Sequence, residues 1–248
     1  MQPATPGTLS FVFQAPGDLP LTDYYWSILH GALLTVGVSL AALLVSALLG
    51  MVGALAKLSH RAVFRVPATL YTTVIRGIPD LVLMLLVYYG GTIGINNLLE
   101  LAGSEATLDL NPFFAGVFTL GFIYGAYMTE TFRGAMLAIP HGQMEAAMAY
   151  GMSPRQAFMR ITAPQMLRYA LPGFTNNWLV LIKATALVSL IGLQEMTYLA
   201  KQASAATRSP FAFFLFTAGL FLVYTWVSLI VLRWLNARYS LGTKRVTL

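Results

Sequence analysis

The chain has 248 residues, of which 57% are hydrophobic and only 10% are charged. Together with a mean hydropathy of +0.70, this composition leaves too little polar surface for a water-soluble globule, so the sequence predicts an integral membrane protein. Cysteine is absent, which excludes disulfides and thiolate metal sites. The three histidines, at positions 30, 60 and 141, do not have metal-ligand spacing, and we expect no metal site.

The N-terminal residues 1–26 are expected to form a tail outside the membrane. Their first 23 residues contain no Lys or Arg, so they lack the basic start of a secretory signal peptide. Five apolar segments follow, each long enough for the roughly 20 residues that a membrane-spanning helix needs. We place them at 27–56, 67–93, 112–135, 169–193 and 211–235. The predicted fold is therefore an all-α integral membrane domain of five helices over residues 27–239, followed by a short tail at 240–248.

The distribution of basic residues orients these spans. Eleven Lys and Arg side chains fall on one side of the predicted membrane: Lys57, Arg61, Arg65, Arg133, Arg155, Arg160, Arg168, Arg233, Arg238, Lys244 and Arg245. The opposite side has only Lys201 and Arg208. Because cytoplasmic loops are enriched in basic residues, we expect the N-terminus outside and the C-terminus in the cytoplasm. Topology thus explains the net charge of +6, and we expect no nucleic-acid partner.

Arg76 and Lys183 are the two remaining basic residues, and both lie inside apolar sequence. Charges at membrane depth are costly and usually face a cavity or a partner. Arg76 and Asp80 have the i, i+4 spacing of an ion pair on one helix, and direct contact with a transported solute is the alternative. Glu130 and Arg133 are spaced i, i+3, which favours a structural pair over a role in a pathway. Lys183 has no charged neighbour within a helical turn, so it either snorkels or faces a polar interior or another subunit.

The sequence does not support catalysis by this chain. Neither an HExxH motif nor a Walker-type glycine loop occurs. We interpret Glu145 as a hydrogen-bonding contact to a partner rather than as a general base. Binding and hydrolysis of a nucleotide would therefore have to occur on another chain.

Residues 140–164 form a polar segment between the third and fourth spans, on the predicted cytoplasmic side. Residues 143–150 have good helix propensity, and Met144, Ala147 and Met148 fall on one face of that helix. A small apolar face outside the bilayer predicts a docking surface for another protein.

Helix breakers divide this segment in a fixed order. Gly151 suits a left-handed C-terminal cap, and Ser153 followed by Pro154 predicts an N-cap and a first-turn proline. Pro164 is expected to interrupt the second helix. The prediction is therefore two short helices that are joined at an elbow.

The same segment resembles a known protein family. The residues that carry the resemblance are Glu145, Ala146 and Ala147, followed by Gly151, Ile161 and Pro164. They are similar to the EAA signature of the permease subunits of bacterial ATP-binding-cassette importers, although Ala163 stands where that family commonly has leucine. Four further stretches resemble the polar amino-acid branch, and most of all its histidine and lysine/arginine/ornithine importers: 76–84, 127–134, 168–173 and 183–189.

The resemblance implies a permease of the type I importer kind and a set of partners. The chain would form a heterodimer with a sister permease and bind two copies of a cytoplasmic ATP-binding subunit. That subunit would hold ATP and Mg, so this chain would need no cofactor of its own. A periplasmic amino-acid-binding protein would deliver the substrate to the bacterial inner membrane. The residues implied in coupling to the ATPase are Glu145, Ala146, Ala147, Met148, Gly151, Ile161 and Pro164.

The resemblance also implies a polar amino acid as the solute. Histidine, arginine, lysine or ornithine is favoured, and an opine or another polar derivative is the alternative. The candidates for the substrate pathway are Arg76, Asp80, Glu130 and Lys183. A different class, an ion-coupled secondary transporter or channel acting alone, is disfavoured because the two halves of the sequence show no internal repeat.

Overall fold

The computed structural model describes residues 21–103, 106 and 110–239. The predicted C-terminal tail at 240–248, and all but the last six residues of the predicted N-terminal tail, lie outside this part of the chain. Every secondary-structure element within it is helical, as the sequence predicts. Residues 21–26 do not belong to a separate tail, because they form the first turns of helix α1 (Leu21–Leu58).

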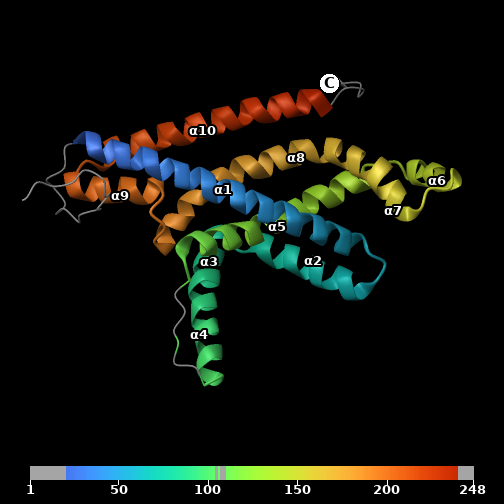
Figure 1. Ribbon diagram of the computed structural model, residues 1–248, viewed down its shortest axis with the longest axis horizontal. Helices are drawn as coiled ribbons and strands as arrows, with labels where there is room; N and C mark the ends of the chain where they lie inside the picture. The colour runs from blue at the N-terminus through green and yellow to red at the C-terminus, as the bar shows by residue number, and fades with distance from the viewer. Residues whose placement is uncertain (1–20, 104–105, 107–109, 240–248) are drawn as a thin grey trace, which may run out of the picture.

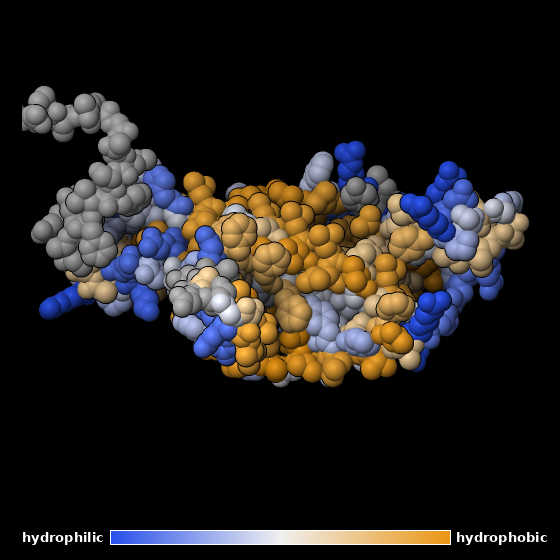
Figure 2. Space-filling view, turned by 60° about the horizontal axis from the view of Figure 1, so that its bottom comes forward, coloured by the Kyte–Doolittle hydropathy of each residue, from blue (hydrophilic) through white to orange (hydrophobic). Residues whose placement is uncertain are grey.

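Among the residues that the structure describes, five helical stretches are long and apolar enough to cross a membrane, in agreement with the predicted number of spans. They are α1, Asp80–Leu101, α5 (Pro112–Leu137), Pro154–Ile191 and α10, which covers Pro210–Tyr239. Figure 2 shows hydrophobic residues covering the middle of the molecule, with hydrophilic residues gathered at its two ends. This distribution is the one expected of a protein whose middle lies in lipid.

The second half of α1 packs against α5 (Figure 1). Glycines permit this close approach. A Cβ atom on Gly50 would lie 2.4 Å from the Cβ of Met128, and one on Gly53 would lie 2.2 Å from the hydroxyl of Thr129. Small residues allow membrane helices to approach in this way, so this pair of helices forms the rigid centre of the fold.

The second predicted span, 67–93, is wrong in its bounds, because the stretch that can cross a membrane is Asp80–Leu101. Helix α2 (Ala62–Gly77) ends before Pro79, and α3 (Asp80–Leu85) begins after it. Ile78 between them is extended, with φ −110° and ψ 138°, because a residue that precedes proline is pushed out of the helical region. Figure 1 shows that the chain then turns steeply away from the long helices through η1 (Leu86–Gly90) and α4 (Gly91–Leu101).

The fourth span also differs from the prediction, because the helix is longer. Helix α7 (Pro154–Ala157), the π-helical turn η2 (Phe158–Thr162), α8 (Ala163–Ala184) and the 3-10 turn η3 (Thr185–Ile191) follow one another without a break. The second half of the predicted docking segment therefore belongs to the start of this span. Helix α9 (Met196–Thr207) then packs on α1 and α10 at the end of the molecule opposite α6 (His141–Ala149), as Figure 1 shows.

Candidate functional site

Helix α6, which lies in the segment predicted to dock another protein, ends where the sequence predicts. Gly151 has φ +81°, its N–H donates to the carbonyl of Met148 at 2.9 Å, and the N–H of Met152 donates to the carbonyl of Ala147 at 3.1 Å. A residue in the left-handed conformation lets these two N–H groups bond to carbonyls of the last helical turn, and the helix ends there. The predicted cap at Gly151 is confirmed.

The elbow after α6 is also confirmed. Ser153 caps α7: its hydroxyl accepts from the N–H of Gln156, and the Gln156 side chain accepts from the N–H of Ser153 at 3.0 Å. Pro154 occupies the first turn, where its missing N–H costs nothing. These reciprocal contacts fix the angle at which the chain leaves the docking helix.

Pro164 does not interrupt the second helix, which corrects the prediction. The π-helical turn η2 precedes it, and Pro164 then lies in the first turn of α8. A wider turn removes the need for the hydrogen bond that proline cannot donate, so the helix continues. The helix that begins at Pro154 is therefore continuous with the fourth span.

The side chains of the docking segment divide between the surface and the interior. Glu145 and Ala146 are exposed, and Met148 is 50% exposed. Ala147 is only 5% exposed, so it packs inside this chain and does not belong to an outer docking face. Ile161 is half-buried and Pro164 is exposed. Apart from Met144 and Ala147, the residues of α6 are exposed at the tip of the molecule and available to a partner.

A second polar cluster lies between the spans around Glu130. The Glu130 carboxylate accepts from the ammonium of Lys57 and, at 3.0 Å, from the guanidinium Nε of Arg133. Lys57 also donates to the hydroxyl of Thr72 at 2.8 Å. The predicted structural pair of Glu130 and Arg133 is present. No residue spacing in the sequence indicated that Lys57 would complete it.

The predicted ion pair of Arg76 and Asp80 is wrong. The break at Pro79 places these residues on different helices, and no ion pair joins them among the described residues. The guanidinium carbon of Arg76 instead lies 5.4 Å from the centroid of the Tyr127 ring. Asp80 accepts a hydrogen bond from the Tyr124 hydroxyl at 3.0 Å. Arg76 and Asp80 therefore each contact a tyrosine of α5.

A cavity of about 460 Å³ connects these two groups of residues. Polar and charged side chains from α1, α2 and α5 line most of it: Lys57, Thr72, Thr73, Arg76, Gly77, Tyr127 and Glu130. A polar cavity within membrane helices is typical of a solute pathway. It therefore brings together two of the four predicted pathway residues, Arg76 and Glu130.

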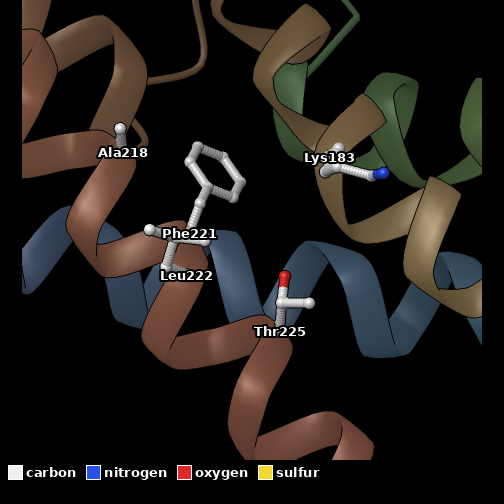
Figure 3. A pocket seen from close by; sticks show the side chains of 5 residues that line it. All are labelled: Lys183, Ala218, Phe221, Leu222 and Thr225. Atoms are coloured by element: carbon white, nitrogen blue, oxygen red, sulfur yellow. The ribbon is translucent and has the colours of Figure 1, made fainter.

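Lys183 lies elsewhere, on a larger and mainly apolar cavity of about 550 Å³ between α8 and α10. Figure 3 shows its side chain directed away from Phe221, which closes the other side of this cavity together with Ala218, Leu222 and Thr225. The side chain is exposed in the single chain. Lys183 therefore does not join the polar cluster of the other pathway candidates.

Glu195 is a buried carboxylate that our sequence reasoning missed. It is 1% exposed, accepts from the hydroxyl of Thr35 at 3.1 Å, and caps α9 by accepting from the N–H of Tyr198 at 2.9 Å. Burial raises the pKa of the Glu195 carboxyl above its usual value. The signal in the sequence is an acidic residue three positions before Tyr198, after the Gly192 turn, which is an N-cap pattern.

The geometry defines the class of protein: a helical membrane protein with polar groups between its spans and an exposed, rigidly joined helix at one end. A family model described as a binding-protein-dependent transport system inner membrane component matches residues 46–241. The chain belongs to this family of transport-system membrane components.

Individual relatives agree with this assignment. The chain is 49% identical to the histidine/lysine/arginine/ornithine transport system permease protein HisQ of Salmonella typhimurium, over 89% of this chain and 96% of that protein. It is 39% identical to the octopine transport system permease protein OccQ of Rhizobium radiobacter, over 89% and 93%. A solved amino acid ABC transporter with histidines has a chain that is 29% identical, with a TM-score of 0.73 over 88% of this chain and 96% of that one.

Proposed function

We propose that this chain is the permease subunit of an ATP-driven importer for basic amino acids. The observation that supports this most strongly is the similarity to HisQ, which extends over nearly the whole chain. Arg76 lines the polar cavity, and Asp80 accepts from the hydroxyl of Tyr124, whose ring lies 5.6 Å from that of Tyr127, so both signs of charge that a basic amino acid requires lie in this region. An octopine-type derivative is the second candidate, since OccQ is also similar over nearly the whole length.

The proposed complex contains a different, sister permease chain and two copies of an ATP-binding subunit that holds ATP and Mg. A periplasmic binding protein delivers the amino acid at the end of the molecule where α9 lies. The N-terminus is periplasmic, and the C-terminus is cytoplasmic together with α6. This orientation follows from the basic residues, eleven of which we assign to the cytoplasmic side.

In the proposed mechanism, closure of the ATPase dimer moves α6 and the helix joined to it. Since the helix from Pro154 to Ile191 is unbroken, this movement reorients the fourth span and exposes the pathway to one side of the membrane at a time. Glu145 and Met148 are the side chains on α6 best placed for contact, because both are exposed.

The test is affinity purification of the tagged chain from its own membranes, followed by reconstitution with its binding protein. We expect an ATP-binding subunit and a second permease to copurify, and ATP-dependent uptake of arginine, lysine, histidine or ornithine. Glu145→Ala should weaken retention of the ATPase by roughly 1–3 kcal/mol, the cost of losing a charged hydrogen bond. Uptake that persists without any ATP-binding subunit would overturn the proposal in favour of a transporter acting alone.

A further inference from the structure

Lys183 is a cation inside the fourth span, and its charge is not compensated by this chain. Its side chain is exposed, and it forms no ion pair in the part of the chain that the structure describes. At roughly 1.5–2 Å per residue, about 15 Å of helix separate Lys183 from Ile191 at the nearer end of the span. The four-carbon stem of a lysine is shorter than this distance, so the ammonium cannot reach the membrane surface. A group within the bilayer must therefore compensate the charge.

The cavity beside Lys183 has an apolar wall. On α10 it is lined by Ala218, Phe221, Leu222 and Thr225, whose spacing places them on one face of that helix. Figure 3 shows the ammonium of Lys183 directed away from Phe221, to the side that α10 does not cover. One cation beside a mainly apolar face is the pattern of a membrane-helix contact that includes a single polar interaction.

The helices that form this face are held in place by other contacts. The rings of Trp178 on α8 and Tyr224 on α10 meet edge to face, with their centroids 6.2 Å apart. The Tyr224 hydroxyl lies 2.6 Å from the hydroxyl of Ser39 on α1. These residues are close in sequence to those that line the cavity, and Leu222 is nevertheless 71% exposed. The face is therefore built into the fold and left uncovered by this chain.

The candidate occupants of this face differ in what they supply at its depth. Acyl chains would cover the apolar wall but carry no charge, and phospholipid headgroups lie at the membrane surface. A hydrated solute is a poor match for the apolar lining. The ATP-binding subunit and the binding protein of the proposed complex lie outside the bilayer. A membrane-spanning helix that carries a carboxylate supplies both the apolar side chains and the anion.

We propose that the face of α8 and α10 around this cavity is the contact surface for the sister permease, and that Lys183 pairs there with a carboxylate on a span of that chain. This assignment rests on the proposed function, which supplies the sister chain, and adds to it the surface and the charge by which the two chains recognise each other. A chain without that carboxylate would leave Lys183 uncompensated in the membrane, so the ion pair selects the correct partner.

The first test is photo-crosslinking, which leaves Lys183 in place. Leu222→p-benzoylphenylalanine is introduced into the complete complex, and the native membranes are irradiated. We expect a crosslink to the second permease. The matched control is the same substitution at Val227, which is exposed on the opposite side of α10 and should not crosslink to that chain. A crosslink from Leu222 to a second copy of this chain, or to no protein, would overturn the proposed surface.

The second test removes the charge and measures how much of the second permease copurifies with the tagged chain. Lys183→Met should weaken retention about 10- to 100-fold, the effect of losing a charged hydrogen bond. Lys183→Glu should weaken it further because two carboxylates then face each other, whereas Lys183→Arg should retain the partner. Lys201→Met, the same substitution on α9 outside the spans, is the control and should assemble as the parent does. Parental retention by Lys183→Glu would exclude the ion pair.

Charge exchange identifies the partner residue. In the Lys183→Glu background, each carboxylate within the spans of the second permease is changed to lysine in turn, and one of these changes should restore assembly. If none of them does, the ion pair is wrong. If Lys183→Met assembles fully but loses uptake, Lys183 lines the pathway and the interface role is overturned. The proposed function fails separately, when the parental complex does not take up basic amino acids with ATP, because crosslinking and retention do not depend on the solute.

Discussion

Lys57 and Glu130 form an ion pair although 73 residues separate them in the chain. Lys57 lies in the last turn of α1, and Glu130 lies on α5, so the pair joins the two helices that form the centre of the fold. Only 13% of the Lys57 side chain and 19% of the Glu130 side chain are exposed. Such limited access to water makes each charge dependent on the other.

Glu130→Gln is expected to destabilise the protein, because Lys57 and Arg133 lose their shared carboxylate. The cost should be roughly 1–3 kcal/mol, the penalty of leaving a charged group without its partner. Thermal unfolding of the purified complex measures it. Glu100→Gln removes an exposed carboxylate on α4 and should leave the midpoint unchanged. Equal midpoints for both variants would show that the pair contributes nothing to stability.

Gly151→Val should impair transport by displacing the docking helix. Left-handed backbone costs a residue with a side chain roughly 1–2 kcal/mol, and a β-branched residue is disfavoured most. Gly142→Val is the control, since Gly142 lies in α6 with ordinary backbone angles and open space around it. Uptake and retention of the ATP-binding subunit are measured for both variants. If Gly151→Val took up substrate at the parental rate, the helix cap at Gly151 would not be needed for coupling.

Asp80→Asn should lose uptake of basic amino acids while ATP hydrolysis is retained. The reason is that a cation in a pathway of low dielectric needs a carboxylate nearby. Tyr124→Phe is the informative control, because it removes the hydrogen bond to Asp80 and keeps the charge. Uptake should fall less in this variant. Unchanged uptake by Asp80→Asn excludes Asp80 from the pathway, and loss of assembly would assign it a structural role.

The buried carboxylate of Glu195 should make stability depend on pH. Its pKa is raised in the folded protein by burial, so the folded state binds the proton more tightly than the unfolded state does. The contribution of Glu195 to stability is therefore fully present below its ordinary pKa of 4.5 and is lost as the pH rises through the folded pKa. Unfolding midpoints compared across this range should fall more steeply for the parent than for Glu195→Gln. Parallel pH profiles would contradict this assignment.

Cysteine labelling tests the orientation in the membrane, and the absence of native cysteine makes the result clean. Lys201→Cys on α9 should react with an impermeant maleimide in intact spheroplasts. Met148→Cys on α6 should react only after the membrane is opened, because we place α6 in the cytoplasm. Labelling of both positions from outside would reject the topology.

Several features of this protein could be predicted from local patterns in the sequence. The number of spans follows from runs of apolar residues, since each spanning helix satisfies its own backbone hydrogen bonds. The cap at Gly151 and the box formed by Ser153 and Gln156 also involve residues only a few positions apart. Such features depend on neighbouring residues alone and can be predicted from them.

The polar contacts between the spans could not be predicted in the same way. Spacing suggested that Arg76 would pair with Asp80, but the backbone break at Ile78–Pro79 separated them and brought each to a tyrosine of α5. In the sequence, Lys57 indicated only the orientation of the spans, and its pairing with Glu130 was not predicted.

The membrane class, the number of spans and the helix α6 with the caps that follow it can be predicted from sequence pattern, because hydrophobicity and helix capping act within a few turns. Packing of the helices in three dimensions sets which charges meet, where the cavity beside Arg76 lies, and the burial of Glu195 against Thr35. These contacts join helices far apart in the chain. Their energies depend on distance and on exclusion of water, and neither quantity is fixed by the spacing of residues along one segment.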